Sequence, residues 1–147
     1  MVESPASRTP IPGAGAVCFR GDAVLLIKRG KAPLEGRWSI PGGRIEWGET
    51  AAQAALRELT EETNVRAELC GLVDVIDALI PGAPGETAAH YLIVDYAARW
   101  IAGEPIAGDD AAEARFFAPE ELPALNLTAD AQRVIALARA RLSGGAA

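Results

Sequence analysis

A capped, alanine-rich helix that ends in three closely spaced glutamates is the feature that most constrains this sequence. Thr50 is a good N-cap residue, and Gln53 three positions later completes a capping box. Alanines and a leucine then favour helix propagation, so the pattern predicts a helix over residues 50–63. At about 100° per residue, one side of this helix is apolar and is expected to face the core; it consists of Ala52, Ala55, Leu56 and Leu59.

The glutamates of this helix break two local preferences. Glu58, Glu61 and Glu62 stand at i, i+3 and i+4, where like charges repel by roughly 0.2–0.5 kcal/mol per pair. They also occupy the last turns, where the helix dipole favours cations by roughly 0.3–1 kcal/mol. Sites that break local rules are often functional. Converging carboxylates suit a divalent cation such as Mg²⁺, and a solvated acidic face is the alternative interpretation.

The rest of the chain mixes strand-like and helix-like segments. Gly21-Asp22 separates two apolar runs and predicts a hairpin. A strand that begins at Arg37 is expected to stop in a turn at Pro41-Gly42-Gly43, where glycine lets the backbone approach a ligand. Strands are predicted over residues 16–20, 23–29, 37–40, 65–79, 90–100 and 113–117. A closing amphipathic helix is predicted over residues 128–142, with Val134, Ile135, Leu137, Ala138 and Leu142 on its apolar side. Antiparallel strands with a helix on each side predict a layered α+β fold.

The length of 147 residues suits one domain. We expect a loosely ordered segment over residues 1–13, a single domain over residues 14–142 and a frayed tail over residues 143–147. The two cysteines lie in apolar surroundings and are predicted to be buried thiols.

Charge and hydropathy exclude several classes of partner. A net charge of −6 argues against binding to a nucleic-acid polymer, but arginines or a bound cation can still hold a small phosphorylated ligand. No apolar stretch approaches the roughly 18 residues of a membrane span, and we do not expect the first residues to act as a signal sequence, because they contain no apolar core segment. We therefore expect a soluble cytoplasmic protein without a membrane partner.

The helix and the segment before it resemble the Nudix box. The matching positions are Gly43, Glu49, Arg57-Glu58-Leu59, Glu61-Glu62 and Val65, at the spacing of that box. Asn64 stands where the family usually has glycine, and asparagine is the next-best residue for a left-handed backbone. Residues 25–29, 38–43 and 114–122 also look like the segments around the box in that family. The resemblance implies the Nudix α/β/α sandwich, in which a mixed sheet lies between helices.

The resemblance also implies roles for the box residues. Glu58, Glu61 and Glu62 correspond to metal-binding and catalytic glutamates, and a backbone carbonyl of Gly42 or Gly43 adds a metal ligand. The cofactor implied is Mg²⁺, with Mn²⁺ as a substitute. Arg57 is expected to pair with Glu49 and so to brace the loop against the helix.

Residues outside the box complete the predicted site. Glu113 is our candidate for an extra ligand or catalytic base, in an acidic loop with Asp109 and Asp110; a merely solvated loop is the alternative. Guanidinium forks match phosphate oxygens. The candidate phosphate-binding residues are Arg29, Arg37 and Arg44, which are otherwise exposed surface arginines.

The reaction implied by the resemblance is attack of water on a phosphorus of a nucleoside diphosphate linked to another group. ADP-ribose is the leading candidate substrate. The alternatives are an enzyme that removes nucleoside triphosphates, including oxidised ones, a Nudix module that senses a nucleotide without hydrolysing it, and an unrelated acidic α+β domain. A homodimer is a further expectation from the family.

Overall fold

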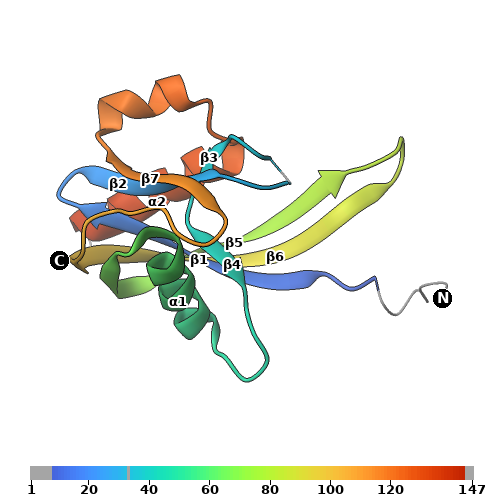
Figure 1. The fold of residues 1–147 in the computed structure, drawn as a ribbon, viewed down its shortest axis with the longest axis horizontal. Helices are drawn as coiled ribbons and strands as arrows, with labels where there is room; N and C mark the ends of the chain where they lie inside the picture. The colour runs from blue at the N-terminus through green and yellow to red at the C-terminus, as the bar shows by residue number, and fades with distance from the viewer. Residues whose placement is uncertain (1–7, 33, 145–147) are drawn as a thin grey trace.

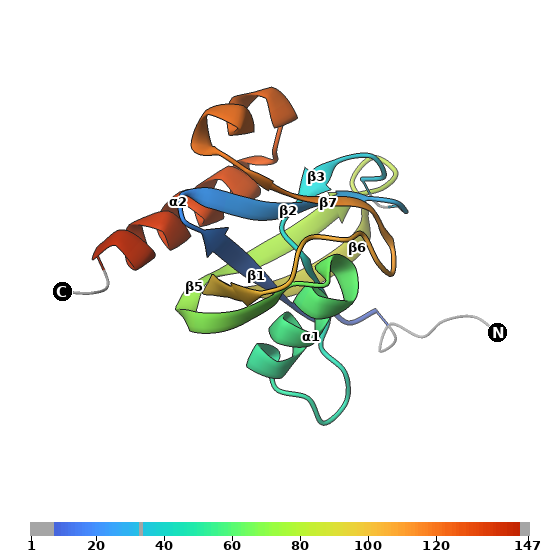
Figure 2. The same cartoon turned by 60° about the vertical axis from the view of Figure 1, so that its left-hand side comes forward.

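The computed structural model of the chain describes residues 8–32 and 34–144. A seven-stranded sheet lies between helix α1 (Ala51–Thr63) and helix α2 (Ala129–Gly144), as Figures 1 and 2 show. The strands are β1 (Ile11–Arg20), β2 (Ala23–Arg29), β3 (Trp38–Ser39), β4 (Gly42–Arg44), β5 (Arg66–Pro81), β6 (Thr87–Ala102) and β7 (Ala111–Phe117). The predicted layered fold, with its sheet between helices, is confirmed.

The sheet is mixed. Its main path runs β3-β2-β1-β6-β5, while β4 pairs with β1 and β7 pairs with β2. Strands β1 and β6 are parallel, with Ile11 opposite Tyr91 and Phe19 opposite Arg99. The residue pattern alone had predicted only antiparallel strands. This pair differs because residues 21–86, including α1, lie between the two strands, and such a long connection allows parallel pairing.

The two faces of the sheet contain different cores. Small side chains of β1, such as Ala14 and Ala16, pack against Leu59 of α1, whereas Val17 belongs to the cluster that includes Val134 of α2. Small residues let α1 approach the sheet closely, which brings its glutamates near the strands.

The apolar sides of the helices differ in detail from the prediction. In α1 the buried residues are Ala54, Ala55, Leu59, Glu62 and Thr63, while Ala52 and Leu56 are only half-buried. In α2 Leu137 is 44% exposed. The helical period was therefore right, but the buried stripe of α1 is rotated so that it includes one of the glutamates.

The predicted caps of α1 are present. Gln53 N donates to Thr50 Oγ1 at 3.1 Å, and Thr50 N donates to Gln53 Oε1 at 2.9 Å. Asn64 ends the helix with φ 64°, and its N–H donates to the Thr60 carbonyl. The left-handed conformation expected at the position where the family has glycine is confirmed.

Several predicted boundaries were wrong. Gly42–Arg44 forms strand β4 and not a turn, because the missing side chain of Gly42 lets it lie against β1. A Cβ on Gly42 would lie 2.6 Å from the Ala14 carbonyl oxygen. Strand β1 begins at Ile11, inside the segment expected to be loose, and α2 continues to Gly144. The rest of the two expected loose ends, residues 1–7 and 145–147, lies outside the described residues.

Two further expectations concern cysteines and membrane spans. Cys18 is buried as predicted, whereas Cys70 is only half-buried. Among the residues that the structure describes, no helix has both the length and the hydrophobicity needed to cross a membrane.

A buried carboxyl group in the centre of the sheet leads to a first testable expectation. Asp95 on β6 is 5% exposed, and its burial, together with Asp74 and Asp130, raises its pKa to about 7. An acid whose folded pKa lies above its unfolded value lowers stability as the pH rises through the interval between the two, here from about 4 to about 7. We expect Asp95→Asn to unfold like the wild type near pH 4. Above pH 7 it should be more stable by about 2–4 kcal/mol.

Urea unfolding of both proteins from pH 4 to 8, in chelator, measures this difference. The exposed Asp77 provides the matched control Asp77→Asn. Parallel curves for wild type and Asp95→Asn across the whole range would contradict the expectation.

Candidate functional site

The end of α1 and strand β4 form the centre of the candidate site. Glu62 is 5% exposed, and its Oε1 accepts a hydrogen bond of 2.8 Å from the backbone N–H of Gly42. Burial raises the pKa of Glu62 to about 8, and the charge of Glu58 acts in the same direction; the Gly42 N–H and Arg29 act in the opposite direction. Burial of a carboxylate is unfavourable unless positive charge lies nearby, so a cation bound at this position would stabilise the ionised form of Glu62.

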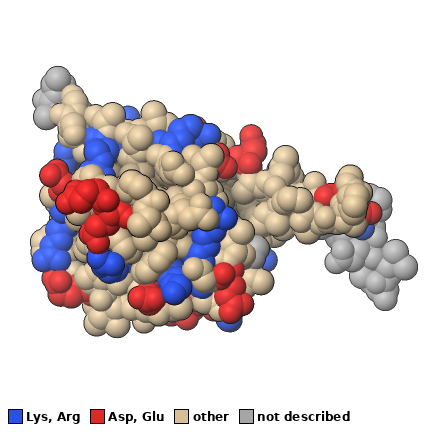
Figure 3. Space-filling model, turned by 90° about the horizontal axis from the view of Figure 1, so that it is seen from above, with Lys and Arg blue, Asp and Glu red and all other residues tan. Residues whose placement is uncertain are grey.

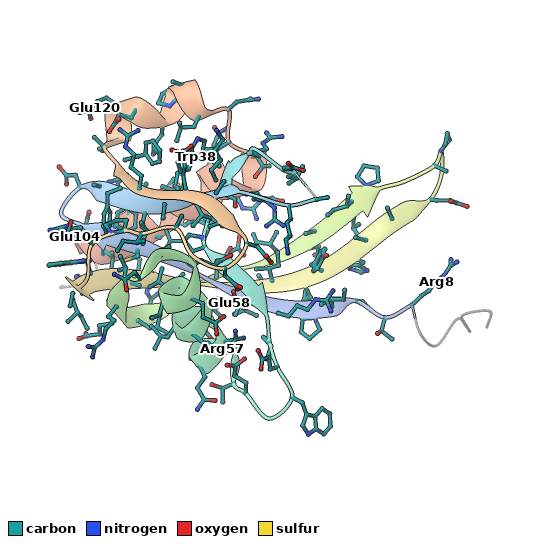
Figure 4. All side chains as sticks on the ribbon, in the orientation of Figure 1. Arg8, Trp38, Arg57, Glu58, Glu104 and Glu120 are labelled. Carbon is teal, nitrogen blue, oxygen red and sulfur yellow. The ribbon has the colours of Figure 1, made fainter. Side chains whose placement is uncertain are left out.

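Three further carboxylates converge beside it. Oxygen atoms of Glu58, Glu61 and Asp109 all lie within 4.8 Å of one another. Burial raises the pKa of Glu58, Arg57 lowers it, and Glu61 and Asp109 add to the increase. Figure 4 shows Glu58 on the side of α1 that faces β4. The carboxylate of Glu58 lies so close to Gly43 that a Cβ there would meet it at 2.5–2.7 Å.

The loop that contains Asp109 is fixed to the end of the helix. Ile106 N donates to the Thr63 carbonyl at 2.9 Å, and Gly108 N donates to the Glu62 carbonyl at 3.1 Å. Carbonyl groups in the last turn of a helix have no partner within the helix, so this loop supplies donors for two of them. Asp109 then adopts φ 52°, and its side chain joins the helix glutamates.

Arg57 connects the helix to the segment before it. Its Nε donates to Glu49 Oε2 at 2.6 Å and its Nη2 to Glu49 Oε1 at 2.9 Å, which is a bidentate pair. Nη1 donates to Glu58 Oε1 at 2.8 Å, and Nη2 also donates to the Arg44 carbonyl at 2.9 Å. The expected pair of Arg57 with Glu49 is therefore present, and the same guanidinium also orients Glu58.

This arrangement predicts the effect of Arg57→Lys. The ammonium keeps the charge but loses the planar fork that holds Glu49 and Glu58 together. Loss of such a supporting contact typically reduces metal affinity or activity about 10–100-fold, and we expect a decrease in this range. Arg57 now holds the pKa of Glu49 at about 2, so the stability from this pair is present above the ordinary pKa of 4.5 and decreases as the pH falls toward 2.

The measurements are Mn²⁺ affinity and an NMR titration of the Glu49 carboxyl in both proteins. Arg133→Lys is the matched control, because Arg133 on α2 also pairs with a carboxylate, that of Asp74 on β5. An unchanged Mn²⁺ affinity and an unchanged Glu49 pKa in Arg57→Lys would contradict the bracing role.

The other predicted site residues are not part of the group formed by Glu58, Glu61 and Asp109. Arg29 ends β2, and its charge lowers the pKa of Glu62. Arg37 donates from Nη2 to the Asn126 carbonyl at 2.9 Å, while its buried Nε has no hydrogen-bond partner among the described residues. Arg44 is exposed on β4. Glu113 lies on β7 and pairs with Lys28 at 3.4 Å.

Two acidic residues of the segment before and within β7 differ in their surroundings. Asp109, not Glu113, joins Glu58 and Glu61. The signal in the sequence was the Gly108-Asp109-Asp110 turn, since glycine and aspartate tolerate the sharp backbone that aims a side chain back at a helix. Glu113 stands within a strand opposite Lys28, where a cross-strand ion pair accounts for it.

The donor atoms of the site fit a hard divalent cation. Carboxylate oxygens are the ligands that Mg²⁺ prefers, and two or three of them leave positions for water and substrate phosphates. Here three carboxylates converge and a fourth, Glu62, is buried beside them. A cation would compensate the repulsion and the desolvation that raise the pKa values of Glu58 and Glu62.

Comparison with known proteins gives a consistent result. The family model described as the NUDIX domain matches residues 9–138. The chain is 35% identical over 116 residues to an ADP-ribose pyrophosphatase of Methanocaldococcus jannaschii, covering 79% of this chain and 66% of that protein. It is 39% identical over 64 residues to an 8-oxo-dGTP diphosphatase of Proteus vulgaris, covering 43% of this chain and 57% of that protein. The chain therefore spans about two thirds or less of the length of these curated relatives.

A solved structure matches over more of its length. The crystal structure of a MutT NUDIX hydrolase from Burkholderia pseudomallei superimposes with a TM-score of 0.75 at 33% identity, covering 88% of this chain and 98% of that one. Its sheet and helices correspond to the layers described above.

Proposed function

The chain belongs to the NUDIX domain family, and we propose that it is a magnesium-dependent hydrolase that cleaves the diphosphate bond of a nucleoside diphosphate linked to another group. We propose that one domain, residues 11–144, carries the activity. The observation that supports this most is the convergence of Glu58, Glu61 and Asp109 next to the buried Glu62. On a merely solvated acidic face, Glu62 would not be buried and Glu58 would not be held by the guanidinium of Arg57.

We propose that Glu58, Glu61, Glu62 and Asp109 hold Mg²⁺ or Mn²⁺, together with a backbone carbonyl of Gly42 or Gly43. Such an ion, when bound, lowers the pKa of water and neutralises phosphate charge. The protein fixes the ligands: Gly42 N–H orients Glu62, and Arg57 orients Glu58. These contacts hold the carboxylates in position before the substrate arrives, which favours catalysis.

Substrate contacts are proposed for Arg29, Arg37 and Arg44. Arg37 is the strongest candidate because its buried Nε lacks a hydrogen-bond partner among the described residues. A phosphate oxygen would supply the acceptor. Arg29 already influences Glu62 through its charge, which places it near the carboxylates, while Arg44 is exposed and its proposed phosphate role depends on the bound substrate.

The proton released by the attacking water must be taken up by a carboxylate near the reacting phosphorus. We propose that the helix glutamates with Asp109 are better placed for this than Glu113, whose carboxylate pairs with Lys28. The substitutions Asp109→Asn and Glu113→Gln distinguish these two candidates for the catalytic base. A larger decrease of kcat in Asp109→Asn supports the carboxylate cluster, and a larger decrease in Glu113→Gln supports Glu113.

ADP-ribose is the proposed substrate, and a nucleoside triphosphate such as 8-oxo-dGTP is the alternative. The relative named ADP-ribose pyrophosphatase matches 79% of this chain, whereas the one named 8-oxo-dGTP diphosphatase matches 43%. The longer match includes the segments beyond the Nudix box that are expected to contact the part of the substrate that differs.

A substrate panel with Mg²⁺ tests the proposal. It contains ADP-ribose, other nucleotide sugars, dinucleoside polyphosphates, 8-oxo-dGTP and the normal triphosphates. Release of AMP from ADP-ribose with the highest kcat/KM supports the proposed substrate, and release of pyrophosphate from 8-oxo-dGTP supports the alternative. Binding of ADP-ribose without cleavage of any compound, with Mg²⁺ or Mn²⁺, would identify a nucleotide-sensing module and overturn the enzymatic proposal.

We also propose that the protein forms a homodimer through the arm made by residues 77–90 of β5 and β6, which projects from the body in Figure 1. Isolated two-stranded hairpins are only marginally stable in water. Leu79 in the arm is 58% exposed, and Val75 and Leu92 at its base are 45% and 40% exposed. Figure 3 shows the arm as mostly uncharged. Its surface therefore suits an apolar partner, and β5 is the edge strand of the sheet.

A second copy of the chain offers both an apolar surface and an edge strand, because two identical edge strands can pair antiparallel around a two-fold axis. We expect light scattering to give twice the chain mass of 15.3 kDa, and Leu79→Glu to give a monomer. Leu137→Glu, at a 44% exposed leucine of α2, should remain dimeric. A monomeric wild type at tens of micromolar would contradict the dimer.

A further inference from the structure

A hollow lined by several arginines lies where the C-terminal end of α2 meets the ends of strands β1 and β6. Its volume is about 330 Å³, and its lining includes Arg20, Asp22, Arg99, Trp100, Arg139 and Ser143. A second hollow of about 400 Å³ shares Arg99 with it and adds Arg141. Together they are called the arginine hollow here. None of these residues belongs to the carboxylate cluster of Glu58, Glu61 and Asp109.

Four arginines line the arginine hollow, whereas Asp22 is the one carboxylate among its lining residues in the part of the chain that the structure describes. Arg20 forms an ion pair with Glu104 at 3.1 Å. Within residues 8–32 and 34–144, Arg99, Arg139 and Arg141 form no ion pair with a carboxylate. The whole chain has a net charge of −6, so three unpaired guanidiniums in one place are a local exception that favours an anion.

The guanidinium of Arg139 has a donor without an acceptor. Its Nη1 donates to the Asp22 carbonyl at 2.8 Å, and the group lies 4.9 Å from the centre of the Phe19 ring. Its Nη2 is buried and has no hydrogen-bond partner among the described residues. A buried donor without a partner is unfavourable, and an anion in the hollow would supply the acceptor.

Arg99 has contacts that a ligand can replace. Its Nη1 lies 3.4 Å from Cys70 Sγ, a weak acceptor, and its Nη2 donates to the Leu142 carbonyl at 3.3 Å. Because both contacts are long or weak, the charged fork is available for a stronger acceptor.

We infer that the arginine hollow binds a small phosphate-bearing anion. Guanidinium forks match phosphate oxygens in geometry and charge, and a hollow of about 330 Å³ has room for such an anion. The nearby aromatic faces are not free to stack on a base, since Arg20 lies 4.2 Å above the Trp100 ring and Arg139 covers Phe19. The phosphate is therefore the recognised group. This site is independent of the proposed hydrolysis and does not rest on it.

A role without any ligand would also place arginines here, because cations near the C-terminus of a helix complement its dipole. The experiment separates the two. The ¹⁵N-labelled protein is titrated with inorganic phosphate at constant ionic strength in chelator, which keeps divalent cations from the α1 carboxylates. We expect saturable shifts of the backbone amides of Gly21, Asp22 and Ser143, which line the hollow.

Variants make the result specific. Arg139→Gln and Arg99→Gln should each weaken phosphate binding at least 10-fold. Arg66→Gln removes the same charge from an exposed position outside the hollow and should leave binding unchanged. Arg99 is exposed, so its variant keeps the test decisive even where Arg139→Gln folds poorly.

Ribose 5-phosphate, titrated in parallel, distinguishes the two sources of the phosphate group. Tighter binding than that of inorganic phosphate assigns the site to a phosphate monoester, and weaker binding assigns it to the free ion. Shifts that do not saturate, shifts confined to α1, or equal affinities in Arg99→Gln and Arg66→Gln would overturn the inference.

Discussion

Replacing Glu62 by glutamine is expected to lower kcat at least 100-fold with the best substrate of the panel. This corresponds to about 2.7 kcal/mol of barrier. Glutamine keeps an oxygen that accepts the hydrogen bond from Gly42 N–H, so the shape of the site is retained. It removes the negative charge that we propose holds the cation, and this charge lies in a buried place where its effect is large.

The same substitution is expected to act in the opposite direction on stability. In the absence of metal, burial holds the pKa of Glu62 at about 8, above the ordinary value of 4.5. The folded protein therefore binds more protons than the unfolded chain between these values, and the stability of the wild type falls as the pH rises through this interval. Glu62→Gln removes this dependence and should be more stable than the wild type at pH 8 in chelator.

Activity assays and urea unfolding of the same preparations measure both effects. Glu120→Gln is the matched control, since Glu120 is exposed on the 3₁₀ helix (Pro119–Leu125), far from Glu58 in Figure 4. An inactive variant that is also less stable at pH 8 would indicate that Glu62 only supports the fold. Full activity of Glu62→Gln would show that Glu62 is not part of the catalytic site.

Substitution of two neighbouring glycines by alanine is expected to have opposite consequences: Gly43→Ala should lower activity, and Gly42→Ala should lower stability. A Cβ on Gly43 would lie 2.5–2.7 Å from the carboxylate of Glu58, the far end of a side chain that can shift. Gly43→Ala should therefore displace Glu58 by a fraction of an ångström to an ångström. Displacements of this size can reduce a rate about 100-fold. The free energy of unfolding should change by less than about 1 kcal/mol, because the backbone need not move.

Gly42→Ala meets backbone instead. Its Cβ would lie 2.6 Å from the Ala14 carbonyl oxygen and 2.9 Å from the Cα of Gly15. Strands β1 and β4 would have to separate, and we expect a loss of stability of about 1–3 kcal/mol, as for other overpacked sites.

Steady-state kinetics and urea unfolding of both variants test this contrast, with Gly144→Ala as the control because a Cβ there meets nothing within 4 Å. If Gly43→Ala loses stability and keeps its activity, the proposed position of Glu58 in the site is wrong.

Much of the site could be predicted because local rules determine it. The capping box fixes the start of α1, and the left-handed Asn64 fixes its end. The helical period then sets the spacing of the glutamates. The box pattern also placed Arg57 beside Glu49, and the structure shows this pair.

What the sequence did not reveal depends on contacts between distant segments. Asp109 joins the glutamates because the loop before β7 donates two hydrogen bonds to the end of α1. The turn at Gly108-Asp109-Asp110 predicts a sharp bend, but it does not tell which carboxylate meets the glutamates of α1. The parallel pairing of β1 with β6 likewise depends on the whole connection between them, and alternating hydrophobicity predicts a strand without its partner or direction.

The strand β4 shows a third limit. Two adjacent glycines usually mark a turn, and that interpretation was wrong here. Their lack of side chains serves close packing in two directions, toward β1 for Gly42 and toward Glu58 for Gly43. Sequence alone does not separate a glycine needed for its backbone angles from one needed for space.

The measurement that tests the central claim most directly is Mn²⁺ binding to the nucleotide-free protein, followed by electron paramagnetic resonance. We predict saturable binding to the wild type and to Glu120→Gln, and affinities at least 10-fold weaker for Glu58→Gln and Glu62→Gln. This result would place the cation on the carboxylates at the end of α1. Equal Mn²⁺ affinities in all four proteins would show that these glutamates do not hold the cation, and the proposed site would then be wrong.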